Sequence, residues 1–133
     1  MPAATVRLLS EASQMEPEVA LRRFVENALG QTPDPALVET IMAHRLARPQ
    51  DPAGWAAQAA AGTGYAGGDR AGDIAAPTLV VTGTADLVVD PANSDLLGEM
   101  IPDARVEKVA DAGHLVFWEY PALVADLIND FLA

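Results

Sequence analysis

The sequence predicts an α/β fold in which a helical region comes first and a parallel βαβα unit with an incomplete sheet comes last. Three observations predict it. The first half of the 133-residue chain carries apolar residues at helical spacing between clear helix starts. Two short runs at 78–82 and 105–109 have the apolar, β-branched character of buried strands. A helical stretch separates these runs, and a strand–helix–strand order makes the two strands parallel.

The expected helices are defined by their first residues. Three Asp-Pro pairs, which begin at positions 34, 51 and 90, place a capping carboxylate before a proline that suits the first helical position. We therefore expect helices at 34–47, 52–61 and 91–100. A further helix is expected at 17–29, where Gly30 ends it, and a last one begins at Tyr120-Pro121. The glycine-rich tract 62–70 is expected to be a loop.

This change of pattern divides the chain into two predicted regions, a helical region at 1–72 and the βαβα unit at 73–133. Two parallel strands make a poor sheet, because parallel sheets are normally covered on both faces and contain more strands. One strand edge should stay open unless another chain segment pairs with it. We therefore expect part of the fold to lie outside this sequence, and an isolated chain that is marginally stable or self-associating.

Composition excludes several classes of partner. The net charge is −11, from 19 acidic and 8 basic residues, which argues against nucleic acid and against anionic membrane surfaces. The chain has no cysteine, which excludes disulfides and thiolate zinc sites and is compatible with a reducing cytosol. No signal-peptide core and no apolar run of membrane-spanning length are present. We expect a soluble cytoplasmic protein.

Asp86 and His114 are the residues that could carry chemistry, because each lies one loop beyond the end of a predicted strand. Sites in α/β sheets are assembled at the carboxyl ends of the strands, and neighbouring strands lie only about 4.8 Å apart. A histidine acts as a base near neutral pH, and a carboxylate holds its tautomer and stabilises the imidazolium. Each residue also has an ordinary interpretation, as a turn aspartate and a solvated loop histidine. Their order and context favour a catalytic pair.

The segments around both residues resemble the α/β-hydrolase superfamily. Residues 77–86, with the sequence PTLVVTGTAD, are similar to its acid-bearing strand, and residues 112–121, AGHLVFWEYP, are similar to its histidine loop and closing helix. Residues 93–104 resemble the helix and turn between them. Within the superfamily the chain looks most like the 3-oxoadipate enol-lactonase and cofactor-free haloperoxidase group. The resemblance implies hydrolysis of a small-molecule ester or lactone by a Ser-Asp-His triad, with Asp86 as the acid, His114 as the general base and no cofactor or metal.

The resemblance also implies that the helical region at 1–72 is a cap, or lid, over the active site. Met42, Trp55 and Tyr65 are then candidates to line the substrate pocket. Apolar residues at helical spacing are more often packed in a core, so that alternative stays open for all three. His44, near the end of an expected helix, is interpreted as a solvated histidine.

The nucleophile of the implied triad is missing from the sequence. The superfamily places it in G-x-S-x-G, and none of Ser10, Ser13 and Ser94 is flanked by the two glycines. Because loss of the serine removes nearly all triad catalysis, we expect the isolated chain to have little activity. The alternative is a non-catalytic or split-subunit module that pairs with an N-terminal partner chain, or with itself, through its open sheet edge.

Overall fold

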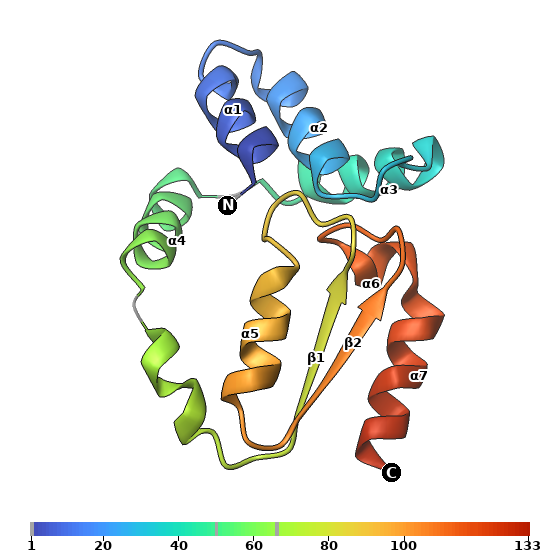
Figure 1. The fold of residues 1–133 in the computed structure, drawn as a ribbon. Coiled ribbons are helices and arrows are strands. Elements are labelled where there is room, and N and C mark those ends of the chain that lie inside the picture. The colour runs from blue at the N-terminus through green and yellow to red at the C-terminus, as the bar shows by residue number, and fades with distance from the viewer. Residues whose placement is uncertain (1, 50, 66) are drawn as a thin grey trace.

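The computed structural model describes residues 2–49, 51–65 and 67–133, and it confirms the predicted α/β class (Figure 1). A helical region precedes a short parallel sheet with helices on both sides. The elements in chain order are α1 (Ala3–Ala12), α2 (Pro17–Asn27), α3 (Pro35–Leu46), α4 (Pro52–Gly64), the 3-10 helix η1 (Gly67–Asp73), β1 (Thr78–Gly83), α5 (Ala92–Met100), β2 (Ala104–Val109), α6 (Val116–Glu119) and α7 (Pro121–Leu132).

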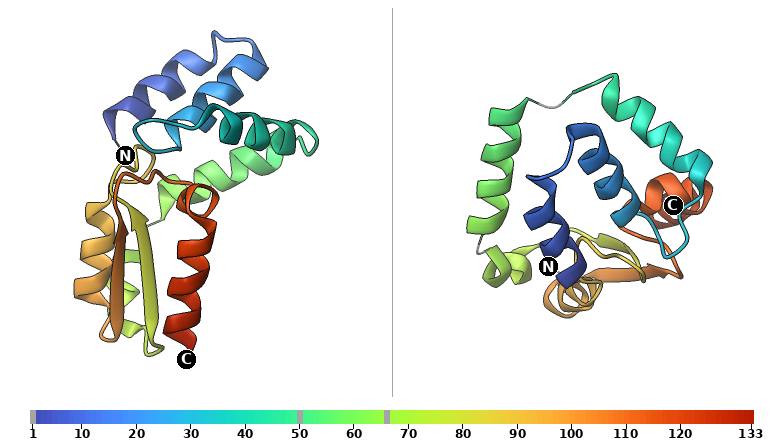
Figure 2. Two further views of the ribbon diagram at one scale, coloured as in Figure 1. Left: turned by 90° about the vertical axis from the view of Figure 1, so that its right-hand side faces the viewer. Right: turned by 90° about the horizontal axis from the view of Figure 1, so that it is seen from above.

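The two strands β1 and β2 form the parallel pair that the sequence predicts. Their register aligns Thr78 with Ala104 and Gly83 with Val109. The pair lies between α5 and α7, as the left view of Figure 2 shows. Within the described residues the sheet has only these two strands, so each strand has one edge without a partner strand.

The first three helices pack together beyond the carboxyl ends of both strands (Figure 1). Their core is closed by Leu115 and Trp118 from the segment after β2, so the helical region and the βαβα unit share one apolar cluster. The described side chains of α4 are all exposed. The buried members of the cluster are Val25, Leu29, Val38, Ile41 and Met42.

Two local predictions are corrected. The prediction of a loop at 62–70 is wrong, because α4 continues to Gly64 and η1 begins at Gly67. Residue 66 of this range lies outside the described residues. Alanine has the highest intrinsic helix propensity, and the alanine residues of α4 carry the helix further than its glycines suggest. Helix α1 has no counterpart among the expected helices. Its N-cap residue Pro2 makes no side-chain capping bond, so α1 lacks the capping aspartate that begins α3 and α4.

Candidate active site

Asp86 and His114 meet at the carboxyl edge of the sheet, each on the loop that follows its strand. Two backbone bonds join these loops: the N–H of Thr84 donates to the carbonyl of Val109 at 3.0 Å, and that of Ala85 donates to the carbonyl of Ala112 at 2.9 Å. The parallel pairing of β1 and β2 therefore brings both side chains to the same end of the sheet.

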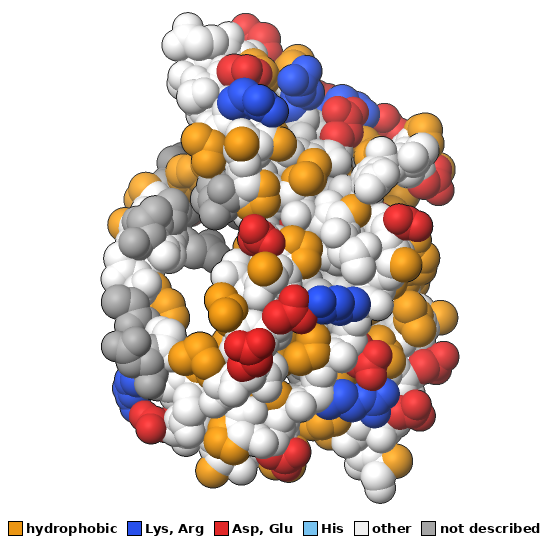
Figure 3. All heavy atoms as spheres, in the orientation of Figure 1, with side chains coloured by type: hydrophobic (Ala, Val, Ile, Leu, Met, Phe, Trp, Pro, Cys, Tyr) orange, Lys and Arg blue, Asp and Glu red, His pale blue; other side chains and the backbone are white. Residues whose placement is uncertain are grey.

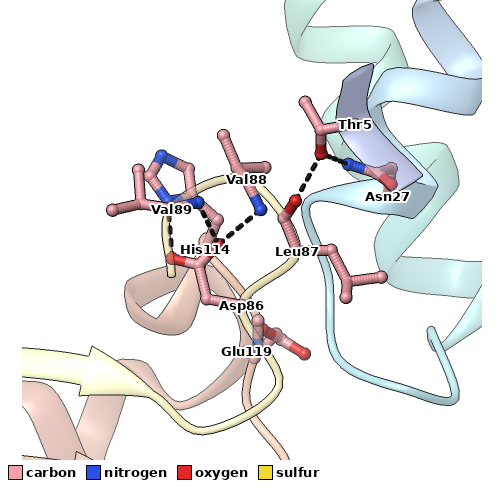
Figure 4. A network of polar contacts seen from close by, with 9 residues as sticks. Thr5, Asn27, Asp86, Leu87, Val88, Val89, His114 and Glu119 are labelled. Carbon is pink, nitrogen blue, oxygen red and sulfur yellow. Dashed lines mark hydrogen bonds and ion pairs between the residues drawn. The ribbon is translucent and has the colours of Figure 1, made fainter. Parts of the chain in front are cut away.

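The two side chains form a direct hydrogen bond, with His114 Nδ1 2.9 Å from Asp86 Oδ2 (Figure 4). A carboxylate only accepts hydrogen bonds, so this contact assigns the ring hydrogen to Nδ1 and leaves Nε2 as an acceptor. The Asp86 side chain is only 7% exposed, whereas the His114 side chain is 41% exposed. The carboxylate is thus enclosed, whereas the imidazole is accessible to solvent.

The second oxygen of Asp86 is held by the turn that follows it. Oδ1 accepts hydrogen bonds from the backbone N–H groups of Val88 at 2.7 Å and Val89 at 2.9 Å. Side chains of aspartate commonly make such bonds to the next residues of a turn. Asp86 is therefore both a turn aspartate and the partner of His114, so its two sequence interpretations are compatible. The turn orients the carboxylate so that Oδ2 is free for the imidazole.

The helical region holds the acid loop through a buried threonine. The Thr5 hydroxyl donates to the carbonyl of Leu87, the residue after Asp86, and the side-chain amide of Asn27 donates to Thr5 Oγ1 at 2.8 Å (Figure 4). Thr5 is 5% exposed. Sequence reasoning missed both residues, because the partners lie far apart in the chain and no local pattern marks them.

The histidine loop is held by Glu119, which sequence reasoning also missed. Glu119 Oε1 accepts from the backbone N–H of Gly30, and Oε2 accepts from that of Gly113, each at 2.7 Å. The N–H of Leu115 donates to the carbonyl of Ala28 at 3.0 Å. The sequence marks Glu119 only weakly. It lies in the segment that resembles the histidine loop, but its partners are backbone N–H groups, which no residue type reveals.

The three candidate pocket residues do not join this pair. Met42 is 2% exposed and belongs to the helical core, which is the alternative that the sequence left open. Trp55 and Tyr65 are 50% and 80% exposed; α4, which carries Trp55, lies to the side of the loops after β1 and β2 (Figures 1 and 2). A pocket role for these two residues stays a prediction. His44 is exposed on α3, with its ring edge-on to Trp118 at a centroid distance of 5.8 Å.

The serines are placed away from any nucleophile-like turn. The Ser10 hydroxyl donates to the carbonyl of Arg7 within α1 at 2.7 Å, Ser13 is the C-cap residue of α1, and Ser94 lies within α5. In the described part of the chain, no group of three or more potential ligand side chains could hold a metal ion. None of the described helices combines the length and apolar character needed to cross a membrane.

Comparison with known proteins agrees with this arrangement. Residues 5–121 match the family model described as the alpha/beta hydrolase fold. The chain therefore belongs to the α/β-hydrolase fold family. The finer resemblance to the 3-oxoadipate enol-lactonase and haloperoxidase group stays a prediction.

Individual relatives match a limited part of this chain. A 56-residue stretch is 48% identical to the polyketide synthase ThaQ of Burkholderia thailandensis, covering 38% of this chain and 3% of the synthase. A 60-residue stretch is 40% identical to the monoacylglycerol lipase ABHD6 of Mus musculus, covering 45% of this chain and 18% of the lipase.

A solved structure resembles nearly the whole chain. It is Est816, described as an N-acyl homoserine lactone degrading enzyme, with 28% identity and a TM-score of 0.67. The similarity covers 98% of this chain and 52% of Est816. The chain thus spans about half the length of that enzyme and a smaller share of the relatives named above.

Proposed function

We propose that this chain supplies the acid and the general base of a hydrolase that cleaves a small ester or lactone with a Ser-Asp-His triad. Asp86 orients His114, and a serine from residues outside this sequence attacks. The observation that carries the proposal is the 2.9 Å hydrogen bond between His114 Nδ1 and the enclosed carboxylate of Asp86. Without the serine, the isolated chain is expected to be inactive.

The geometry suits each proton transfer of such a reaction. With Nδ1 donating to Asp86, the exposed Nε2 can take the proton from the serine hydroxyl as its oxygen attacks the carbonyl carbon. The same nitrogen then returns this proton to the leaving alkoxide. In the second half of the reaction, Nε2 takes a proton from a water molecule as its oxygen attacks the acyl carbon. The bond between this carbon and the serine oxygen then breaks, which releases the acid, and Nε2 returns the proton to the serine oxygen. The Asp86 carboxylate stabilises the imidazolium that forms in both halves of the reaction.

The names of the relatives support the substrate class. One relative is named a monoacylglycerol lipase and one similar structure is described as an N-acyl homoserine lactone degrading enzyme, and both of these named compounds contain a carboxylic ester bond. The helices α1–α3 lie beyond the carboxyl edge of the sheet, as a cap over the site would. We extend the cap to residues 1–72 as part of this proposal.

The test is to complete the fold and then remove the base. The chain is combined with the serine-bearing N-terminal half of a relative such as Est816, and hydrolysis of p-nitrophenyl butyrate is measured on the purified complex. His114→Ala should lower kcat by about 10²–10⁴-fold, the usual contribution of a general base. His44→Ala removes the other of the chain's two histidines and should leave kcat unchanged. A purified complex that keeps its full rate with His114→Ala would contradict the proposal.

The open sheet edge supports a second candidate function, a non-catalytic module that pairs with an N-terminal partner chain or with a second copy. Besides the free strand edges, α5 exposes the apolar side chains of Leu96, Leu97 and Met100, and orange patches lie among the acidic side chains in Figure 3. Light scattering distinguishes the two candidates. A monomer with slow amide exchange at 78–82 would exclude the pairing module.

A further inference from the structure

We propose that Glu119 is a positioning residue that holds His114 in line with Asp86. This inference rests on the proposed function, because the alignment matters for catalysis only if His114 is the base. The two hydrogen bonds of the Glu119 carboxylate go to backbone N–H groups and not to Asp86 or the imidazole, so its effect on the base acts through the backbone of the histidine loop.

The first support is the geometry of the Glu119 carboxylate. One oxygen accepts the N–H of Gly30, 89 positions earlier in the chain, and the other accepts the N–H of Gly113, 6 positions earlier, both at 2.7 Å. Hydrogen bonds between a backbone N–H and a carboxylate are short and about twice as strong as neutral ones. One side chain thereby joins the segment that follows α2 to the loop that carries His114.

The second support is the position of His114 between two anchored residues. Its predecessor Gly113 is held by Glu119, and its successor Leu115 donates its N–H to the carbonyl of Ala28 at 3.0 Å. The imidazole is 41% exposed, and its hydrogen bond to Asp86 requires that the backbone place the ring within reach of that carboxylate. The direction in which the ring leaves the backbone is therefore set by the two flanking peptide groups.

The third support is the close approach of the two backbones that Glu119 joins. A methyl group on Gly113 would overlap the backbone of Leu29, and one on Gly30 would overlap the carbonyl of Asp111. The backbones of the segments 28–30 and 111–115 are thus in direct contact. In this contact the N–H groups of Gly30 and Gly113 take their acceptors from a single side chain, that of Glu119.

The substitution of Glu119 by glutamine tests the charge and the hydrogen bonds of the side chain without changing its size. Glu119→Gln keeps the length of the side chain, but the amide has one acceptor oxygen, and its nitrogen is a donor. It can satisfy one of the two backbone N–H groups and must face the other with a donor. Glu99→Gln, at an exposed position on α5, removes the same charge elsewhere and serves as the matched control.

The experiment measures the tautomer of the His114 ring in the full 133-residue chain by long-range ¹H–¹⁵N NMR, at a pH where the ring is neutral. The wild-type ring should carry its hydrogen on Nδ1, because it donates to Asp86. Asp86→Asn should lose this preference. Glu119→Gln, in its folded state, should lose it to the same extent, whereas Glu99→Gln should retain it. A residue that only stabilised the fold would change the unfolding midpoint and leave the tautomer of the folded chain unchanged.

The outcomes separate the two proposals. If Asp86→Asn changes the tautomer and folded Glu119→Gln does not, the positioning role is overturned and the proposed function stands. If Asp86→Asn has no effect, the pairing that carries the proposed function is overturned. If Glu119→Gln does not fold, amide exchange on the wild type decides. There the N–H groups of Gly30 and Gly113 should exchange at least about tenfold more slowly than unprotected amides, and unprotected rates at either would overturn the proposal.

Discussion

The hydroxyl of Thr5 donates a hydrogen bond to the carbonyl of Leu87, which lies 82 positions further along the chain and directly follows Asp86. The oxygen of the same hydroxyl accepts the amide of Asn27, so its donor and acceptor functions are both used. One small side chain of the first helix therefore ties α1 and α2 to the loop that carries the acid.

Removing the Thr5 hydroxyl should lower the stability of the fold. Thr5→Val keeps the shape but leaves the Leu87 carbonyl and the Asn27 amide without this partner, which should lower the free energy of unfolding by about 1–3 kcal/mol. Urea unfolding at a fixed temperature measures the change. Thr40→Val is the control, because the exposed Thr40 hydroxyl bonds only within α3 and its loss should cost less than about 0.5 kcal/mol. Equal effects of the two substitutions would contradict this role of Thr5.

The contact between the histidine loop and α2 leaves no room for a side chain at Gly113. Gly113→Ala should destabilise the fold by about 1–3 kcal/mol, because its methyl group must displace the backbone of Leu29. Gly62→Ala, where the new methyl group meets nothing within 4 Å, should instead stabilise α4 by up to about 1 kcal/mol. Thermal unfolding of the two variants should therefore shift in opposite directions.

Sequence reasoning succeeded where the physical cause is local. Asp34 and Asp51 accept hydrogen bonds from backbone N–H groups two and three residues later, so a short stretch of sequence contains both partners of each helix cap. The meeting of Asp86 and His114 followed from strand order alone. Thr5 and Glu119 could not be found in this way, since their partners lie 82 and 89 positions away and only the folded chain brings them together.

Met42 tests whether a candidate pocket residue is instead part of the core. Because its side chain is 2% exposed in the helical core, Met42→Ala should lower the free energy of unfolding by about 2–5 kcal/mol. Met100→Ala, at a methionine that is 39% exposed, is the matched control and should cost clearly less. Denaturant unfolding gives both values. A Met42→Ala variant as stable as the wild type would show that this side chain contributes little to the core.

The ion pair between α2 and α3 should make stability depend on pH. A hydrogen bond from Arg22 to Glu39, at 2.6 Å, and the Arg22 charge lower the pKa of Glu39 below its ordinary 4.5. A carboxyl whose pKa is lower in the folded state stabilises the fold above its ordinary pKa, and this contribution is lost as the pH falls through the folded pKa. Glu39→Gln should therefore be slightly less stable than the wild type near neutral pH and equal to it in strong acid.

The control for the ion pair is a double-mutant cycle. Both groups are exposed, so the effect should be small. Arg22→Gln should remove the same pH-dependent contribution, and adding Glu39→Gln to it should remove nothing further. Additive losses would show that the two side chains act independently.

The open strand edges should make the isolated chain a poor folding unit. We expect calorimetry to show transitions that occur at low temperature or depend on protein concentration. The helical region and the βαβα unit should unfold separately, because the buried residues of each apolar cluster come from one part only, although the partly buried Leu115 and Trp118 pack against the cluster of the helical region. Adding the N-terminal half of a relative should merge and raise these transitions. One sharp, reversible, concentration-independent transition above about 65 °C would contradict the view that the isolated fold is incomplete.

The sequence separation between Glu119 and Gly30 has a consequence for biosynthesis. A ribosome releases Thr5 and Gly30 before the residues that they bind, which follow 82 and 89 positions later. Contacts between such distant positions form slowly, because a large loop must close first. We therefore expect the side chains of Asp86 and His114 to be aligned only in the last stage of folding. A nascent chain that stops between His114 and Glu119 already holds both side chains, and we expect it to lack their alignment.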